Sequence, residues 1–218
     1  MGMDEYLAAN RALWDEWTAI HETSSFYDLE AFKAGGSRLR DYEVDEVGDV
    51  TGKSLLHLQC HFGIDTLSWA RLGARVTGAD FSDRAIELAR SLAAELRLDA
   101  TFVRSDLYDL PSVLDGQFDV VYTSRGVLGW LPDLGRWAGV VAHFLRPGGV
   151  FYMTEIHPVA QAFAFVDWPV PFLVRQDDGT WCLPPDAGGE LPLFFSLRAQ
   201  PLTAPRVKPW TKRSRKKL

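Results

Sequence analysis

Short apolar runs alternate with amphipathic segments through most of this 218-residue chain, and this alternation limits the possible folds more than any other feature. Each run is short enough for a strand, and the segments between runs have helical spacing. Because the strands are apolar on both faces, helices must cover both sides of their sheet. The sequence therefore predicts an α/β fold with a doubly wound, mostly parallel sheet. The expected strands are 54–60, 74–80, 100–106, 118–124 and 148–155, and the expected helices are 64–72, 82–97 and 133–145.

The regions on either side of this alternation give three predicted parts. Residues 1–50 contain a helical pattern at 4–20 and are expected to form an N-terminal helical lid. Residues 51–200 form the main domain, and its last strand is expected at 191–199. A complete doubly wound domain has a helix–strand unit before that strand, and this chain is expected to lack the unit. Residues 201–218 are a basic tail that we expect to be disordered.

Composition and charge exclude several classes of protein. The net charge is −6, but the last fourteen residues hold seven Lys and Arg, which leaves 16 basic against 29 acidic residues elsewhere. A domain with this excess of acidic residues is a poor binder of nucleic acid. No run approaches the roughly 20 apolar residues of a membrane span, and the N-terminus lacks the pattern of a secretory signal. Two cysteines cannot form a disulfide framework, so we expect a cytoplasmic protein.

Two acidic residues end predicted strands at the edge where a doubly wound sheet binds its ligand. Asp80 follows Gly63 by 17 residues, and an acid at the end of the second strand can accept both hydroxyls of a ribose. The alternative role is a helix cap, but Ser82 or Asp83 can fill that role. Asp106, at the end of the third strand, could accept a hydrogen bond from the exocyclic amine of adenine, or it could form an Asx turn.

The stretch "LLHLQCHFGIDT" (55–66) gives the loop after the first strand, and Gly63 is its single glycine. A pyrophosphate requires several glycines and a positive helix end. Here Asp65 lies in the first helical turn, where its charge would repel a diphosphate and attract an amine. We expect His61 to adopt a left-handed conformation, which histidine tolerates. S-adenosylmethionine (SAM), which has no phosphate, fits these constraints better than NAD.

A metal site is the other possible reading of this loop. His57, Cys60 and His61 lie within five residues, but the sequence contains no second cysteine or histidine pair with zinc-ligand spacing. We therefore expect no metal, and we interpret Cys60 as a small buried apolar residue.

The loop, Asp80, Asp106 and "LRPGGVFYMTE" (145–155) together resemble the class I (Rossmann-like) SAM-dependent methyltransferases. The stretch from Gly52 to Arg90 is most similar to a bacterial subgroup whose loop reads LQCHFGxDTLSxA. This resemblance implies a SAM-dependent methyltransferase that acts on a small-molecule acceptor. The residues that it assigns to the SAM site are Gln59, Cys60, Gly63, Thr66, Asp80, Phe81, Ser105, Asp106, Leu107 and Thr123.

Methyl transfer requires alignment of the nucleophile, the methyl group and the sulfur, and an oxygen or nitrogen nucleophile can also need a base. The candidate bases are His157 and Glu155 at the end of the fifth strand. His21, Tyr27 and Trp130 are expected to form the substrate lid, where His21 and Tyr27 are further candidate bases and Trp130 could instead serve packing. A turn is the alternative role for His157.

Two other functions remain compatible with the sequence. One is a catalytically silent SAM-binding or interaction protein, which the shortened C-terminal part favours. The other is an NAD(P)-dependent oxidoreductase, which Asp65 and the lack of further glycines in the loop oppose. An incomplete sheet edge could also favour a homodimer.

Overall fold

The computed structural model describes residues 3–157, 174–175, 181–182 and 194–200. Its centre is a six-stranded sheet with the order β3-β2-β1-β4-β5-β8. Strands β1 to β5 are parallel, and β8 pairs antiparallel with β5. The predicted doubly wound, mostly parallel sheet is therefore confirmed. The strands are β1 (Ser54–Leu58), β2 (Arg75–Asp80), β3 (Ala100–Arg104), β4 (Phe118–Thr123), β5 (Leu145–Ile156) and β8 (Phe194–Ala199), and a separate pair is formed by β6 (Val174–Arg175) and β7 (Trp181–Cys182).

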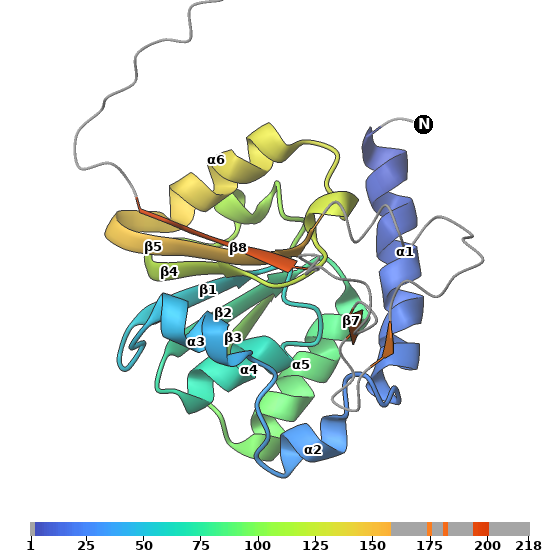
Figure 1. Cartoon of the computed structure of the whole chain (residues 1–218). Coiled ribbons are helices and arrows are strands. Elements are labelled where there is room, and N and C mark those ends of the chain that lie inside the picture. The colour runs from blue at the N-terminus through green and yellow to red at the C-terminus, as the bar shows by residue number, and fades with distance from the viewer. Residues whose placement is uncertain (1–2, 158–173, 176–180, 183–193, 201–218) are drawn as a thin grey trace, which may run out of the picture.

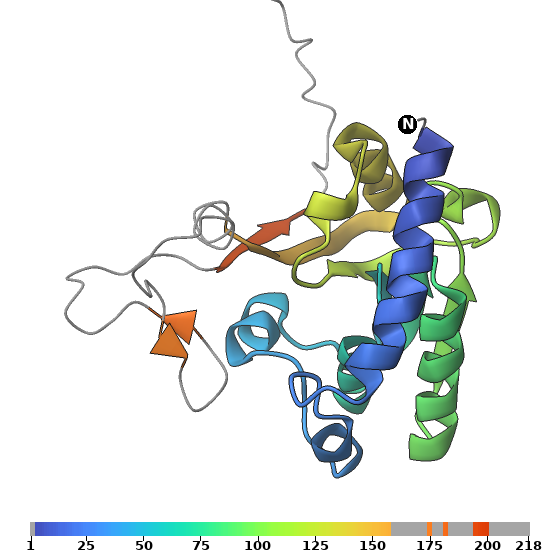
Figure 2. The same cartoon turned by 90° about the vertical axis from the view of Figure 1, so that its right-hand side faces the viewer.

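Helices cover both faces of the sheet, with α6 on one face and α3, α4 and α5 on the other (Figure 1). The long helix α1 stands beside the sheet rather than on either face (Figures 1 and 2). None of the described helices is long and apolar enough to cross a bilayer. The helices are α1 (Met3–Glu22), α2 (Leu29–Lys33), α3 (Asp41–Val47), α4 (Ile64–Arg71), α5 (Asp83–Leu96) and α6 (Leu134–Phe144), with short 3₁₀ helices η1 (Leu110–Ser112) and η2 (Leu128–Trp130).

Alternation along the strands divides the core between these two faces. Leu56 and Leu58 pack with α6, whereas Leu55 packs with the tyrosines of β4 and β5 on the opposite face. On that face Tyr122 and Tyr152 stack with their ring planes 1° apart and their centroids 6.1 Å apart. A two-residue period with apolar residues at every position is what a sheet covered on both sides requires. Because both faces of the sheet are packed, the strands are held in place, and so is the edge of the sheet at which their carboxyl ends lie.

Gly63 sets the start of α4 and cannot be replaced without strain. Its φ of +76° is left-handed, and a Cβ at this position would lie 2.6 Å from the ring of Phe102 on β3. Glycine tolerates this conformation at little cost, and the missing side chain lets α4 approach the sheet closely. The predicted start of a helix at residue 64 is confirmed by this geometry.

One helix of the fold was not predicted, and two predicted features lie outside the described residues. The sequence pattern did not predict α3, a seven-residue helix with the acidic and β-branched sequence DYEVDEV. Residues 158–173, 176–180 and 183–193 lie outside the described residues, so the missing helix–strand unit stays a prediction. The basic tail, 201–218, lies outside the described residues as well.

Candidate ligand site at the carboxyl ends of the strands

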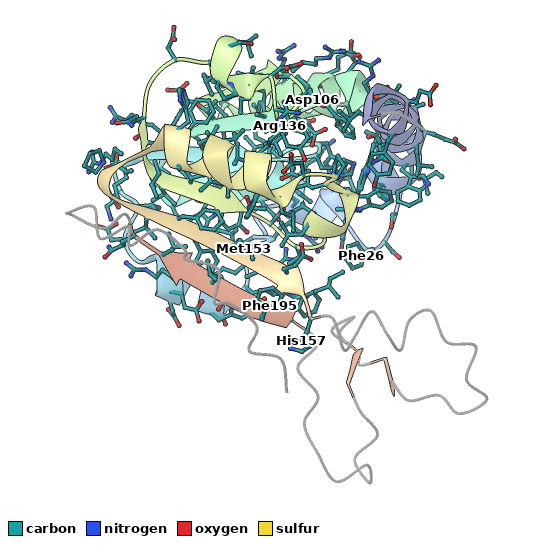
Figure 3. All side chains as sticks on the ribbon, turned by 90° about the horizontal axis from the view of Figure 1, so that it is seen from above. Phe26, Asp106, Arg136, Met153, His157 and Phe195 are labelled. Carbon is teal, nitrogen blue, oxygen red and sulfur yellow. The ribbon has the colours of Figure 1, made fainter. Side chains whose placement is uncertain are left out.

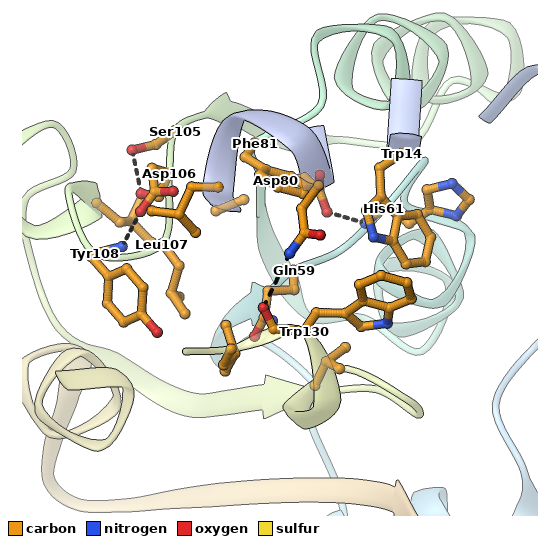
Figure 4. Close-up of a pocket in the computed structure, with 16 residues that line it drawn as sticks. Trp14, Gln59, His61, Asp80, Phe81, Ser105, Asp106, Leu107, Tyr108 and Trp130 are labelled. Carbon is orange, nitrogen blue, oxygen red and sulfur yellow. Dashed lines mark hydrogen bonds between the residues drawn. The ribbon is translucent and has the colours of Figure 1, made fainter. Parts of the chain in front are cut away.

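A pocket lies between α1 and the carboxyl ends of β1, β2 and β3 (Figure 4). Residues from five parts of the chain meet there: the first helix, the loop after each of the three strands, and the segment around η2. Parallel strands end at one edge, so side chains that are distant in sequence meet at that edge. The lining includes Leu7, Asn10, Trp14, Gln59, His61, Asp80, Phe81, Ser105, Asp106, Leu107, Tyr108, Val127, Trp130 and Leu131.

The carboxylate of Asp80 lines this pocket at the end of β2. One oxygen accepts from the backbone N–H of His61 at 2.8 Å, and the other accepts from that of Ser82 at 3.0 Å. Burial raises the pKa of Asp80 to about 6, although these backbone N–H groups act in the opposite direction. Each oxygen keeps a lone pair for a hydroxyl donor. The cap of α5 is instead Ser82, which accepts from the backbone N–H of Ala85 at 3.0 Å.

Asp106 lies across the pocket from Asp80, after β3. Its Oδ1 accepts from the backbone N–H of Tyr108 at 2.8 Å, so the Asx turn considered from the sequence is present. That bond uses one oxygen and still leaves the carboxylate among the residues that line the pocket. Burial raises the pKa of Asp106. Ser105 and Leu107 flank this carboxylate and also line the pocket.

The loop after β1 turns sharply at two residues that are not glycine. His61 has φ +52°, which confirms the expected left-handed conformation, and Gln59 has φ +57°, which the sequence pattern did not indicate. Gln59 Oε1 is buried and has no hydrogen-bond partner among the described residues, although Gln59 lines the pocket. A buried polar atom without a partner costs free energy unless a ligand or water supplies one. This atom is therefore free to accept a hydrogen bond from a polar group that enters the pocket.

Four other predicted SAM-site residues do not line the pocket but lie around it. Cys60 is buried against Phe62 and Phe102, and Gly63 begins α4. Thr66 Oγ1 bonds to Nδ1 of the buried His57 at 2.8 Å, while His57 Nε2 lies 3.1 Å from Ser124 Oγ. Thr123 is fully buried at the end of β4, and its hydroxyl has no partner among the described residues.

A cluster of charges next to the loop was not predicted as part of the site. Arg125 pairs with the fully buried Glu43 of α3 at 2.8 Å and with Asp65 at 3.5 Å. Burial raises the pKa of Asp65 to about 6, and the charge of Arg125 opposes that rise. The sequence predicts that Asp65 repels a diphosphate and attracts an amine, but its charge is paired with Arg125 and it is not among the residues that line the pocket.

Arg38 belongs to the same cluster and has a different environment. Its guanidinium lies over the rings of Phe26 and Tyr27, at 5.5 and 6.0 Å from their centroids. Within the described part of the chain it makes no side-chain hydrogen bond or ion pair. Burial lowers the pKa of Arg38, the nearby Asp65 acts in the opposite direction, and Arg125 acts in the same direction as burial. A half-buried cation without an ion-pair partner among the described residues can bind an anionic ligand group.

The predicted lid residues belong to one aromatic cluster beside the pocket. His21 lies 4.8 Å from Tyr27 and 5.1 Å from His61, measured between ring centroids. Trp14 of α1 contacts both His61 and Trp130, at 5.3 and 5.4 Å. Burial lowers the pKa of His21, and its Nδ1 has no partner among the described residues. The structure thus brings His21, Tyr27 and Trp130 together around the loop after β1.

The two predicted bases at the end of β5 have different surroundings. The carboxylate of Glu155 is buried and accepts hydrogen bonds from four backbone N–H groups, so its oxygens are engaged. His157 lies beside Phe195 of β8, with 6.1 Å between the ring centroids. Figure 3 shows this pair well away from Asp106. Neither residue lines the pocket.

No group of three or more His, Cys, Asp or Glu side chains in the described parts of the chain is arranged to hold a metal ion. The three residues considered for such a site have separate environments. His57 bonds to two hydroxyls, Cys60 is packed among apolar side chains, and His61 lies in the aromatic cluster.

Fold and pocket together define a Rossmann-like α/β domain whose ligand site lies at the carboxyl ends of its strands. The match with known proteins agrees with this class. Residues 55–149 match the family model of a methyltransferase domain. The structure of DhpI in complex with SAH aligns with a TM-score of 0.52 at 22% identity, covering 78% of this chain and 74% of that one. The Rossmann-like methyltransferase fold predicted from the sequence is thereby confirmed.

Sequence relatives give a more specific comparison. A ubiquinone biosynthesis O-methyltransferase from Shewanella pealeana is 29% identical over 136 residues, which cover 62% of this chain and 57% of that protein. One from Aromatoleum aromaticum is 30% identical over 132 residues, with coverages of 61% and 56%. A structure from work on the conversion of a disulfide bond into a thioacetal group during echinomycin biosynthesis is 31% identical, with a TM-score of 0.50 and coverages of 56% and 51%. The chain therefore spans less than two thirds of the length of these relatives.

Proposed function

We propose that this protein is a SAM-dependent methyltransferase that transfers a methyl group to a small-molecule acceptor. The observation that carries this proposal is that Asp80 and Gln59 line the same pocket. Asp80 offers acceptor lone pairs suited to ribose hydroxyls, and Gln59 Oε1 is a buried acceptor that has no partner in the described part of the chain. The match of residues 55–149 to a methyltransferase domain supports the same reading.

As part of this proposal we assign individual residues to the groups of SAM, four of them from the pocket lining and Arg38 from the charge cluster beside it. Asp80 would accept from the ribose hydroxyls, Phe81 would lie against the adenine, and Asp106 would accept from the adenine amine. Gln59 Oε1 would accept from the amino group of the methionine part, and the guanidinium of Arg38 would hold its carboxylate. The loop carries the LQCHFGxDTLSxA pattern, and we assign the chain to that subgroup as part of this proposal.

SAM supplies an electrophilic methyl group on a sulfonium, and the protein contributes position and a dry environment. Trp14 and Trp130 close the pocket on the side of α1. Among the candidate bases we favour His21, which lies in the aromatic cluster beside the pocket, because its Nδ1 lacks a partner among the described residues and burial lowers its pKa, so that the ring stays neutral. The Tyr27 hydroxyl would stay protonated, since burial raises the pKa of this group to about 12.

The acceptor most consistent with the comparisons is a small molecule with a hydroxyl group, because the relatives are named as O-methyltransferases. Residues 1–50 would act as the lid, because α1 covers the pocket and residues of the following loop join the aromatic cluster. A cytoplasmic location and a homodimer remain part of this proposal.

Calorimetric titration with SAM, S-adenosylhomocysteine (SAH) and NADH tests the cofactor. We expect heat from the first two, and loss of that heat in Asp80→Ala. Binding of NADH alone would overturn the proposal in favour of an oxidoreductase. A panel of phenols and other hydroxyl compounds with radiolabelled SAM then tests the transfer. Tight SAM binding without transfer to any acceptor would support a silent SAM-binding protein instead.

A further inference from the structure

We infer that Glu155 is a positioning residue that holds the wall of the ligand pocket from inside the protein. The sequence indicated Glu155 as a possible base, but its contacts assign it a different task. Its Oε1 accepts from the backbone N–H of Gly126 at 2.8 Å and of Ile156 at 2.6 Å. Its Oε2 accepts from the N–H groups of Val127 at 3.0 Å and Leu128 at 2.8 Å.

Three of these four donors are consecutive and belong to the turn that follows β4. Gly126 has φ +80°, so the chain turns there and directs three successive N–H groups to one point. Such a concave set of N–H groups binds an anion. Here the anion is a buried side chain from the neighbouring strand, so the turn is tied to β5. Hydrogen bonds to a charged acceptor are about twice as strong as neutral ones.

The turn held by Glu155 leads directly into the wall of the pocket. Val127, Trp130 and Leu131 all line the pocket, and all lie within four residues of the bonded turn. Trp130 also contacts α1, because its carbonyl accepts from Asn10 Nδ2 at 3.4 Å and its ring lies 5.4 Å from that of Trp14. One carboxylate therefore sets the position of the wall and the place where α1 rests on it.

This inference rests on the proposed function only for the identity of the ligand. Glu155→Gln keeps the shape of the side chain but replaces one acceptor oxygen by a donor that faces backbone N–H groups. We expect faster hydrogen exchange at the amides of 126–128, with strand β4 unchanged. We also expect SAH to bind at least tenfold more weakly under conditions where the variant is fully folded.

Asp119→Asn is the matched control, because Asp119 is a buried acid at the opposite end of β4 that also accepts from a backbone N–H group, that of Ser54 at 2.8 Å. Both variants lose a buried polar contact, but only Glu155→Gln should loosen 126–128 and weaken SAH binding. Unchanged exchange at 126–128, or faster exchange with unchanged SAH affinity, would overturn the positioning role. If the wild-type protein binds no SAH, the proposed function fails, while the exchange experiment still tests whether Glu155 holds the turn.

Should Glu155→Gln fail to fold, Glu155→Asp offers a second variant. It keeps the charge but withdraws the carboxylate by one methylene, so the bonds to Val127 and Leu128 should lengthen. We expect an intermediate increase in exchange at 126–128 and an intermediate loss of SAH affinity. Exchange and affinity equal to those of the wild type would contradict the inference.

Discussion

A buried carboxylate that accepts hydrogen bonds from a ligand makes binding depend on pH, and under the proposed function Asp80 is such a group. Burial raises its pKa to about 6, so acidification below that value protonates it and turns an acceptor oxygen into a donor. We expect the Kd for SAH to be constant above pH 7 and to rise by up to about tenfold per unit below pH 6. Calorimetric titrations from pH 5 to pH 8 measure this dependence.

Two variants separate Asp80 from the other acid with a similar pKa. Burial also raises the pKa of Asp65 to about 6, so this group titrates in the same range. Asp65→Asn should keep the loss of affinity below pH 6, whereas Asp80→Asn should bind SAH weakly at every pH. If Asp65→Asn abolishes the dependence, Asp65 rather than Asp80 is the group that controls binding.

Arg38 allows a test that compares two ligands instead of two proteins. Its guanidinium is stacked on Phe26 and Tyr27 and is assigned to the carboxylate of the cofactor. Arg38→Gln should weaken SAH binding by one to two orders of magnitude, which corresponds to about 1.4–2.8 kcal/mol for a charge-assisted contact. Binding of 5′-methylthioadenosine, which lacks the amino-acid end, should not change.

A second stacked arginine provides the control for this comparison. Arg71 lies 4.2 Å from the ring centroid of Phe32, and neither it nor Arg38 is among the residues that line the pocket. The Arg71 guanidinium, however, already donates to the carbonyls of Phe32 at 2.9 Å and Gly36 at 2.5 Å. Arg71→Gln should leave the affinity for both ligands unchanged. An equal loss for SAH and methylthioadenosine in Arg38→Gln would mean that Arg38 supports the pocket and does not contact the carboxylate.

At the scale of elements, the junction between β1 and α4 depends on Gly63. Alanine there would carry a left-handed φ of +76° and a Cβ only 2.6 Å from the ring of Phe102. Alanine at Gly116, where φ is +97°, would carry a similar backbone strain, but its Cβ would have no described atom within 4 Å. We expect Gly63→Ala to be destabilising by at least about 2 kcal/mol more than Gly116→Ala, because overpacking adds to the strain. Urea unfolding of both variants measures the difference, and equal losses would show that Phe102 moves aside.

The elements of the sheet could be predicted from the sequence, because their apolar runs are short, dense and bounded by turns. The predicted helix at 82–97, for example, is observed as Asp83–Leu96, with Ser82 as its cap. The helix α3 could not be predicted in this way. Its stability comes from tertiary contacts, since Glu43 accepts from the hydroxyls of Tyr122 at 2.7 Å and Thr154 at 3.1 Å and pairs with Arg125.

The same reason limits how much of the candidate site the sequence could reveal. Asp80 and Asp106 are visible because each follows a strand, and strand ends meet at one edge. Arg38 lies in a loop without any pattern, and only the packing of Phe26 and Tyr27 places it near Asp65. The role of Glu155 could not be predicted either, because its partners are backbone N–H groups, which every residue carries.

At the scale of the whole molecule, several buried titratable groups act on stability in opposite directions as the pH falls. Burial lowers the pKa values of His57 and His61 to about 3, so acidification protonates them in the unfolded state only and favours unfolding. Burial raises the pKa values of Asp65 and Asp80 to about 6, so the folded state binds protons there first. From these four groups, stability should fall throughout between pH 7.5 and 4, but less steeply than the two histidines alone would cause, because the raised pKa values of the two acids offset part of their effect.

His57→Gln isolates one contribution to this balance. The glutamine amide can still bond to Thr66 or Ser124, which His57 contacts at 2.8 and 3.1 Å, but it does not titrate. In the wild type, His57 lowers the free energy of unfolding by about 2 kcal/mol between pH 7.5 and 5, given an unfolded pKa of about 6.5 and a slope of about 1.4 kcal/mol per unit. The variant should lack this part of the loss, so urea unfolding at the two pH values should show a smaller difference than in the wild type. Equal differences in both proteins would mean that His57 is protonated in the folded state, which its burial and the nearby charge of Arg125 oppose.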